Sequence, residues 1–241
     1  MPGQTSSPSR SSAARTVRAR VERGGARFWR HSDFKGLPSS AVATALSRLA
    51  REGTLQRVAK GVYYRSAPTS FGPSMAGAGA VAAQTLRAPV HPTGLSAANL
   101  LGLSTQNPMR PEYATSASGR PRALDAAVVH TRRPAGRATL SIEDGAILET
   151  LRNRARFSDL PPEQTVAHLL RLLSHDGRFE RLNSAAMDEP PRVRAMLGAL
   201  GQQLRAPERT LGKLRASLNP LSRYDFGALR GLPHAREWQA K

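Results

Sequence analysis

The fold is decided by residues 28–65, which read FWRHSDFKGLPSSAVATALSRLAREGTLQRVAKGVYYR. Within this stretch, residues 39–52 carry apolar side chains at the i, i+3, i+4 and i+7 spacing of a helix that buries one side. The residues of that apolar stripe are Val42, Ala45, Leu46 and Leu49. Ser39 is expected to cap the helix at its start, and Gly53 to end it.

The segments on either side complete a known order of elements. Residues 27–29 predict a short strand, and Ser32 is expected to cap a brief helix over residues 33–36. After the main helix, residues 55–58 and 62–65 are strand-like and join through a turn that contains Gly61. Strand, two helices and hairpin in this order predict a winged helix-turn-helix, which places its second helix in a DNA major groove.

The exposed side of the predicted recognition helix is polar, and the hairpin after it is basic. Hydroxyl groups and an Arg48 guanidinium on the helix suit base edges, whereas cations on the hairpin suit phosphates or the minor groove. The predicted DNA-binding residues are Ser39, Ser40, Thr44, Ser47, Arg48, Arg51, Arg57, Lys60 and Arg65. The alternative is an ordinary charged surface on a small helical domain. The complete order of elements favours DNA binding.

The charge of the chain points to an anionic partner. The 241 residues have a formal net charge of +19, and residues 1–70 hold 13 Lys/Arg against 3 Asp/Glu. Nucleic acid, an acidic protein or a membrane surface would each fit such a charge. Arg far outnumbers Lys, and Ala, Gly and Pro are abundant, so codon bias of a GC-rich genome is an alternative source of the charge beyond residue 70.

The sequence predicts an α+β fold with two domains. We expect a disordered leader over residues 1–10, a winged helix-turn-helix over 11–66, a linker over 67–73 and a second domain over 74–241. The second domain is expected to be mixed α/β and mainly helical towards its C-terminus. Its predicted helices lie near residues 143–152, 162–174, 178–186, 191–204 and 207–218.

Several classes of site are disfavoured by residue content. The chain has no Cys, which excludes disulfides, thiolate nucleophiles and Cys-type zinc sites and suits the cytoplasm. No run of 18 apolar residues is present, so no membrane span is expected. There is no phosphate-binding glycine loop with Lys and no Gly-x-Ser-x-Gly elbow. We therefore expect no catalytic residue, no metal ligand and no cofactor, and a protein that is not an enzyme.

For a few pairs of titratable residues, a structural role explains their position better than a functional one. His168 and His175 lie seven residues apart, not at the i, i+4 spacing of a metal pair. The acidic residues 143–144 suit the first turn of a helix, and the acidic residues 188–189 before two prolines suit a solvated turn. Asn99 is expected to brace a turn rather than contact a partner.

Two segments resemble a known family. Residues 33–64, described above, are one; residues 94–106, which read GLSAANLLGLSTQ, are the other and the more discriminating. Both are similar to segments of the AbiEi-like (abortive infection) antitoxins of type IV toxin–antitoxin systems. The likeness covers about residues 25–135, and the last 90 residues show none.

This resemblance implies a function in two parts. The N-terminal winged helix would bind inverted repeats of double-stranded DNA in its own promoter and repress the operon. Because the symmetry of half-sites mirrors that of the protein, a dimer or cooperative pair on such a repeat is expected. The remainder would counteract a cognate nucleotidyltransferase-like toxin without a stable complex.

Two other classes stay open. One is a nuclease or nucleic-acid-modifying enzyme that uses the winged helix for targeting; a carboxylate cluster in residues 71–160 would favour it. The other is a stand-alone regulator whose second domain responds to a small ligand or a protein, which a sizeable apolar pocket would favour.

Overall fold

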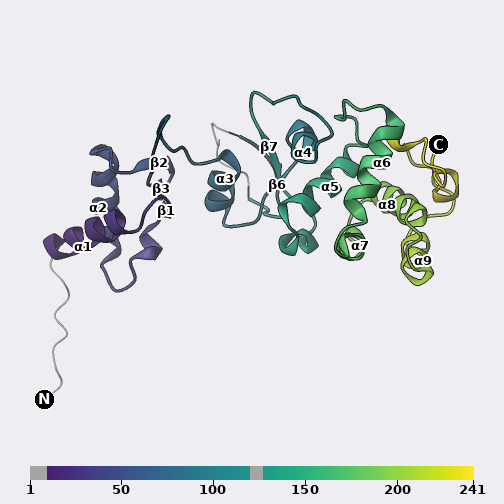
Figure 1. The fold of residues 1–241 in the computed structure, drawn as a ribbon. Coiled ribbons are helices and arrows are strands. Elements are labelled where there is room, and N and C mark those ends of the chain that lie inside the picture. Colours follow the sequence, from purple (N-terminus) through teal and green to yellow (C-terminus); the bar gives the residue numbers. More distant parts are fainter. Residues whose placement is uncertain (1–9, 120–126) are drawn as a thin grey trace, which may run out of the picture. The chain divides into compact units, whose positions relative to one another are not determined.

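The computed structural model describes residues 10–119 and 127–241. The chain has an α+β fold and divides into two compact units, Met1–Arg87 (unit 1) and Ala88–Lys241 (unit 2). Figure 1 follows it from purple to yellow and labels the main elements. The predicted leader lies outside the described residues except for Arg10, where the first helix begins.

Unit 1 contains a winged helix-turn-helix. Its three-stranded sheet has the order β1-β3-β2, with both pairs antiparallel. A short 3-10 turn over His31–Asp33 precedes the recognition helix, and it overlaps the brief helix predicted over residues 33–36 only at Asp33. The elements are α1 (Arg10–Arg23), β1 (Phe28–Trp29), η1 (His31–Asp33), α2 (Ser39–Arg51), β2 (Gln56–Ala59) and β3 (Val62–Tyr64).

One apolar core orients α2 within unit 1. All four residues of the predicted apolar stripe are buried, as expected. They pack with Trp29 and Phe34, whose rings stack with centroids 5.5 Å apart. Burying a Val or Leu side chain contributes roughly 1.5–3 kcal/mol. This burial fixes which side of α2 faces solvent.

The ends of α2 agree with the sequence at one end only. Gly53 and Gly61 have φ of +79° and +71°, so both glycines sit in the left-handed region that the helix end and the hairpin turn require. At the start, Pro38 occupies the cap position and makes no side-chain bond, and Ser39 is already the first helical residue. The prediction that Ser39 caps the helix is wrong, because proline fixes the extended entry instead.

The brief turn before α2 is also capped differently from the prediction. The Arg30 N–H donates to Asp33 Oδ2 at 2.8 Å, which closes the turn over His31–Asp33. A carboxylate three residues ahead therefore satisfies the backbone here, and Ser32 does not.

The predicted linker over residues 67–73 forms a small hairpin. Strands β4 (Pro68–Thr69) and β5 (Gly72–Pro73) pair antiparallel within unit 1. Helix α3 (Ala78–Leu86) also belongs to unit 1, whose boundary with unit 2 lies at Arg87 and Ala88. Proline and glycine punctuate an edge hairpin as readily as a linker, which explains why composition alone placed the boundary too early.

Unit 2 combines a small sheet with a helical bundle. Strands β6, β7 and β8 lie in that order, β6–β7 antiparallel and β7–β8 parallel. Most residues of α5 and α8 are buried in one large core. The elements are β6 (His91–Pro92), α4 (Gly94–Leu100), β7 (Glu112–Ala114), β8 (Val128–His130), η2 (Ala135–Thr139), α5 (Ile142–Arg152), α6 (Pro162–Leu173), α7 (Arg178–Ala186), α8 (Pro191–Gln203), α9 (Glu208–Ala216), η3 (Gly227–Leu229) and η4 (Arg236–Trp238). The predicted helical C-terminal part is confirmed.

Candidate nucleic-acid interface

Helix α2 presents a polar side to solvent because its apolar stripe faces the core. The predicted contact residues on this helix all lie on the exposed side, namely Ser39, Ser40, Thr44, Ser47, Arg48 and Arg51. Hydroxyls lie towards the start of the helix and guanidinium groups towards its end. A helix that enters a major groove needs such a row of donors and acceptors.

Two of these hydroxyl groups already have partners within the protein. Thr44 Oγ1 donates to the Ser40 carbonyl at 2.9 Å, which leaves its lone pairs facing outwards. Ser47 Oγ lies 3.1 Å from the hydroxyl of Tyr63, a buried residue of β3. Ser47 therefore joins α2 to the sheet.

Arg48 is held in place by an acidic residue that the sequence did not single out. Its Nε donates to Glu52 Oε1 at 2.8 Å, and Arg18 of α1 pairs with the same carboxylate. Hydrogen bonds from Arg18 and then from Arg48 hold the pKa of Glu52 below its ordinary value. The i, i+4 spacing of Arg48 and Glu52 is the signal that identifies this pair. Because 69% of the Arg48 side chain is exposed, the pair orients the guanidinium more than it stabilises the fold.

The hairpin next to α2 carries two exposed cations. Arg57 lies in β2 and Lys60 in the turn before β3, and neither forms an ion pair within the described ranges. The register of the two strands shifts between Arg57 and Ala59, which twists the tip of the hairpin. Unpaired cations on a projecting hairpin suit phosphate contacts.

Arg65 takes a different role from the predicted one. Its Nη1 donates to the Val21 carbonyl at 2.7 Å and also to the Glu22 carbonyl. Both carbonyls belong to the last turn of α1, where a cation also favours the helix dipole. Arg65 closes the end of α1, a structural role that the sequence did not predict, and its contact with DNA stays a prediction.

A cationic groove runs between α1 and α2. Its volume is about 250 Å³, and Arg15, Arg18 and Arg48 stand along it above apolar side chains. The sequence showed that α1 is rich in arginine but not that its arginines lie beside the recognition helix. The positive surface is therefore broader than α2 and the hairpin alone.

Unit 2 holds a buried ionic network centred on Glu149. This carboxylate is 1% exposed and accepts hydrogen bonds from Arg133 Nε at 2.7 Å and from Thr93 Oγ1 at 2.7 Å. Arg137, itself fully buried, pairs with it as well. Burial alone would raise the pKa of Glu149, but the Arg133 hydrogen bond and the charges of Arg137 and Arg133 lower it to about 2.

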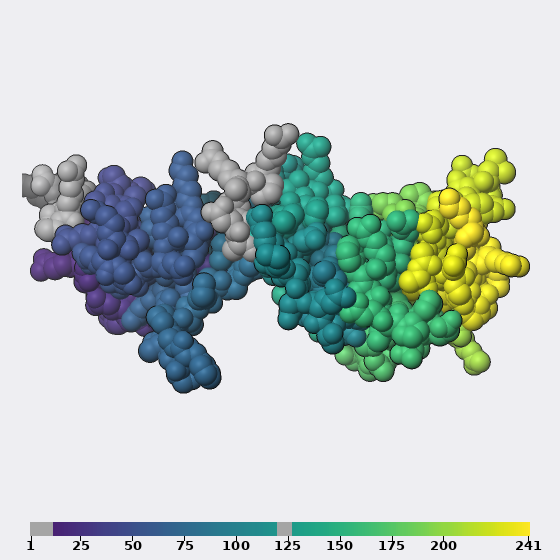
Figure 2. Space-filling view, turned by 90° about the horizontal axis from the view of Figure 1, so that it is seen from above, coloured from purple at the N-terminus to yellow at the C-terminus, as the bar shows by residue number. Residues whose placement is uncertain are grey.

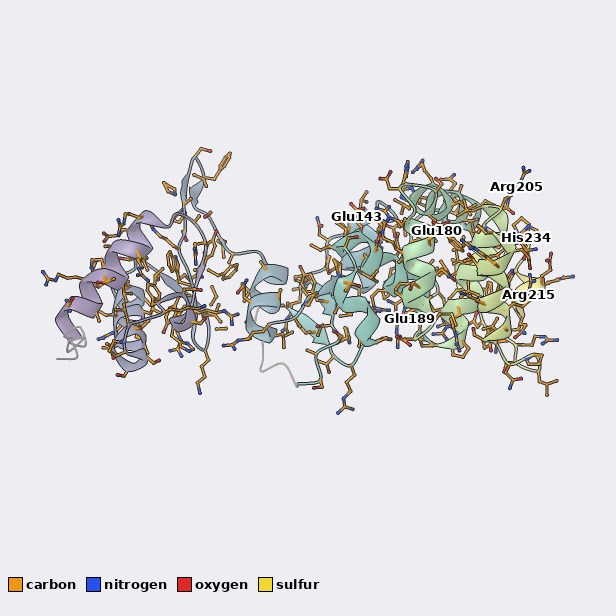
Figure 3. The ribbon with its side chains drawn as sticks, turned by 90° about the horizontal axis from the view of Figure 1, so that it is seen from below. Glu143, Glu180, Glu189, Arg205, Arg215 and His234 are labelled. Atoms are coloured by element: carbon orange, nitrogen blue, oxygen red, sulfur yellow. The ribbon has the colours of Figure 1, made fainter. Side chains whose placement is uncertain are left out.

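The network continues to Glu189, which Figure 3 labels. Arg137 Nε donates to Glu189 Oε1 at 2.5 Å, and Arg152 Nη1 donates to Glu189 Oε2 at 2.6 Å. The prediction that residues 188–189 form a solvated turn is wrong for Glu189, because two arginines compensate its burial. The network connects η2, α5 and the residues just before α8, and each of its two carboxylates is paired with two arginines. We infer that it stabilises the packing of these elements in unit 2.

Other polar residues of unit 2 are also explained by structure. Asp144, in the first turn of α5, pairs with Arg178 at 2.9 Å and Arg181 at 3.1 Å. His168 Nε2 lies 2.6 Å from the Leu101 carbonyl, at the end of α4. Asn99 Nδ2 reaches the Ser104 carbonyl at 3.5 Å, in keeping with bracing of the turn.

Three further findings concern possible metal sites, membrane spans and ligand pockets. Within residues 10–119 and 127–241, no three His, Cys, Asp or Glu side chains gather as a metal site would require. Over the same part of the chain, no helix combines the length and apolarity needed to span a membrane. An apolar cleft of about 270 Å³ lies between α6 and the C-terminal segment, with Glu163 and Gln203 at its edge. This volume is just below the ~300–1,000 Å³ typical of small-molecule sites.

Comparisons with known proteins give a partial match to a family model and a similarity in fold. Residues 20–133 match a family of unknown function, DUF6088, over somewhat less than half of the chain. The chain is similar in structure to the RV2827C protein from Mycobacterium tuberculosis, known from a crystal structure. That similarity has a TM-score of 0.50 at 18% sequence identity and covers 88% of this chain and 83% of the other, so it concerns the fold. No curated protein matches the chain.

Proposed function

We propose that this protein is a DNA-binding transcriptional autorepressor and the antitoxin of a type IV toxin–antitoxin system. In this proposal α2 enters the major groove of an operator with inverted repeats, and Arg57 and Lys60 hold the flanking phosphates. Unit 2 counteracts a nucleotidyltransferase-like toxin. The protein acts in the cytoplasm and is not an enzyme.

One observation carries the DNA-binding part. A helix whose apolar side is fixed in the core exposes hydroxyls and guanidiniums beside a cationic hairpin, in the order of a winged helix-turn-helix. The antitoxin part rests on the resemblance of residues 33–64 and 94–106 to the AbiEi-like family. The segment 94–106 lies in unit 2, so the likeness extends past the DNA-binding module.

Arg48→Ala is expected to weaken binding to the operator by about 1–3 kcal/mol if Arg48 contacts a base. Fluorescence anisotropy with a duplex carrying the protein's own promoter would measure the loss. Arg223→Ala, which removes the same charge from an exposed position of unit 2, serves as the control. Equal operator affinity of the wild type and Arg48→Ala would remove Arg48 from the base-reading set.

Unit 2 alone is expected to relieve growth arrest caused by the toxin. The experiment co-expresses residues 88–241 with the toxin encoded beside this gene and compares growth with that of cells producing the full chain. A separate compact unit with its own core should fold without unit 1. A folded 88–241 fragment that leaves the arrest unchanged would reject this division of labour.

A further inference from the structure

The β4–β5 hairpin is a small, well-braced projection of unit 1. The backbone N–H of Ser74 donates to the Ala67 carbonyl at 2.8 Å, and Ser74 Oγ accepts from the Ala67 N–H at 2.8 Å. At the tip, Thr69 Oγ1 donates to the Gly72 carbonyl at 2.6 Å, and the Tyr64 hydroxyl lies 3.2 Å from Ser74 Oγ at the base. Figure 2 shows this blue segment extending from the first unit.

The braced hairpin holds apolar side chains out into solvent. Phe71 at its tip is 100% exposed, and Met75 at its base is 81% exposed. Residues 66–76 contain no Asp, Glu, Lys or Arg, although the whole chain has a net charge of +19. An aromatic ring held rigidly in water on an uncharged surface is typical of an interaction site.

A groove lies directly beside the β4–β5 hairpin, whose exposed apolar residues Phe71 and Met75 we call the apolar knob. Its volume is about 620 Å³, and Pro68 and Pro73 of the hairpin form one wall. The remainder is lined by residues at the end of α2 and after it, among them Ala50, Leu55 and Arg57. The groove is mostly apolar and can accommodate a phenyl ring. A knob and a matching groove on one surface make that surface complementary to itself.

We propose that this surface binds a second copy of the same chain, with Phe71 of each copy inserted into the groove of the other. A self-complementary patch of this kind produces a two-fold dimer. Charge is compatible with the same occupant, because the inserted hairpin, residues 66–76, carries no cation that would repel Arg57 in the groove of the other copy, and an aromatic ring is a favourable neighbour for a guanidinium. The dimer does not depend on DNA.

Duplex DNA is a poorer occupant of this surface. Side chains that wedge between base pairs are accompanied by several cations that hold the adjacent phosphates. Residues 66–76 supply none, and Arg57 is the one cation among the described residues that line the groove. In addition, β3 starts at the cationic turn and ends towards the β4–β5 hairpin, so the two projections lie at opposite ends of that strand.

The expected dimer is weak. A phenylalanine buries about 150–250 Å², so two Phe71 rings, two Met75 side chains and the groove walls fall near the lower limit of roughly 1,200 Å² for stable interfaces. Association should therefore depend on protein concentration and be sensitive to a single side chain.

Cross-linking between two different variants tests the arrangement, because the chain has no native Cys. Full-length Ser70→Cys, with its thiol at the hairpin tip, is mixed with a differently tagged Thr54→Cys, with its thiol in the groove, and oxidised. The mixed disulfide dimer should form in at least about tenfold higher yield than with Leu221→Cys, an exposed position of unit 2, in place of Ser70→Cys. Equal yields would overturn the proposal.

Sedimentation velocity over a concentration series gives the second measurement, without DNA. The wild type and Leu221→Ser should show the same association, and Phe71→Ser should lower the association constant at least about tenfold. Phe71 is fully exposed, so the variant should keep the circular dichroism spectrum and melting temperature of the wild type. A wild type that stays monomeric, or a dimer that Phe71→Ser leaves unchanged, would overturn the proposal. A monomer that loses DNA affinity on Phe71→Ser would overturn it in favour of a DNA wedge.

Discussion

Glu149→Gln should lower the free energy of unfolding of unit 2 by about 3–5 kcal/mol, because it removes one partner of a buried ionic network. The substitution preserves shape but leaves Arg133 and Arg137 without the carboxylate that compensates their burial. Urea denaturation followed by the fluorescence of Trp238, which is buried in unit 2, would measure the loss. A Trp29→Phe background removes the signal of unit 1.

Glu149 also predicts how the stability of unit 2 depends on pH in the acid range. The pKa of Glu149 is about 2 in the folded chain, below its ordinary value of 4.5. A lowered folded pKa contributes stability that is fully present above about pH 4.5 and is lost as the pH falls through 2. At about 1.36 kcal/mol per pH unit, the contribution at neutral pH is on the order of 3 kcal/mol. In Glu149→Gln, this part of the decrease in the free energy of unfolding at low pH should be absent.

The matched control for Glu149 is a carboxylate outside the network. Glu163→Gln changes an exposed residue of α6 and should alter stability by less than about 0.5 kcal/mol. Equal stabilities of Glu149→Gln and Glu163→Gln would show that the buried network does not brace unit 2.

Binding to the operator should fall steeply with salt. With about four to six phosphate contacts per protomer, log K should decrease with log[salt] at a slope of roughly −4 to −5. Between about 50 and 200 mM salt, affinity should therefore drop roughly 250- to 1,000-fold. The reason is release of counterions as cations of unit 1 replace them on the phosphates. Fluorescence anisotropy over a salt series gives the slope.

Variants of the β2–β3 hairpin show which of its cations contact phosphates and so contribute to this slope. Arg57→Ala and Lys60→Ala should each weaken binding to all DNA sequences alike and flatten the slope by about 1. Arg223→Ala, in unit 2, should leave the slope unchanged. A wild-type affinity that is indifferent to salt would count against electrostatic docking, and unchanged slopes in both hairpin variants would exclude the hairpin from the contact.

The sequence predicted unit 1 well because its signals are local. The apolar stripe of α2 follows from helical spacing, and Gly53 and Gly61 mark a helix end and a turn that need positive φ. Non-local facts were not predictable in this way. Arg65 looked like a wing cation because its partners, the carbonyls of residues 21–22, lie more than 40 residues away.

Unit 2 shows the same limit more strongly. Its helices could be located from periodicity, but Glu189 was misjudged as solvated because its burial depends on Arg137 and Arg152, distant in sequence. In unit 1, composition indicates a linker over residues 67–73 where the structure has a hairpin, because the hairpin is braced by hydroxyl groups of Thr69 and Ser74 that carry no signal of their own.

The most direct test of the account is an NMR titration of the ¹⁵N-labelled full chain with a duplex carrying its own promoter. We predict that the amide shifts that change most lie in residues 39–51 of α2 and residues 56–61 of the hairpin. Binding that leaves these residues unperturbed and shifts only the helices of unit 2, or an absence of binding at low salt, would contradict the account.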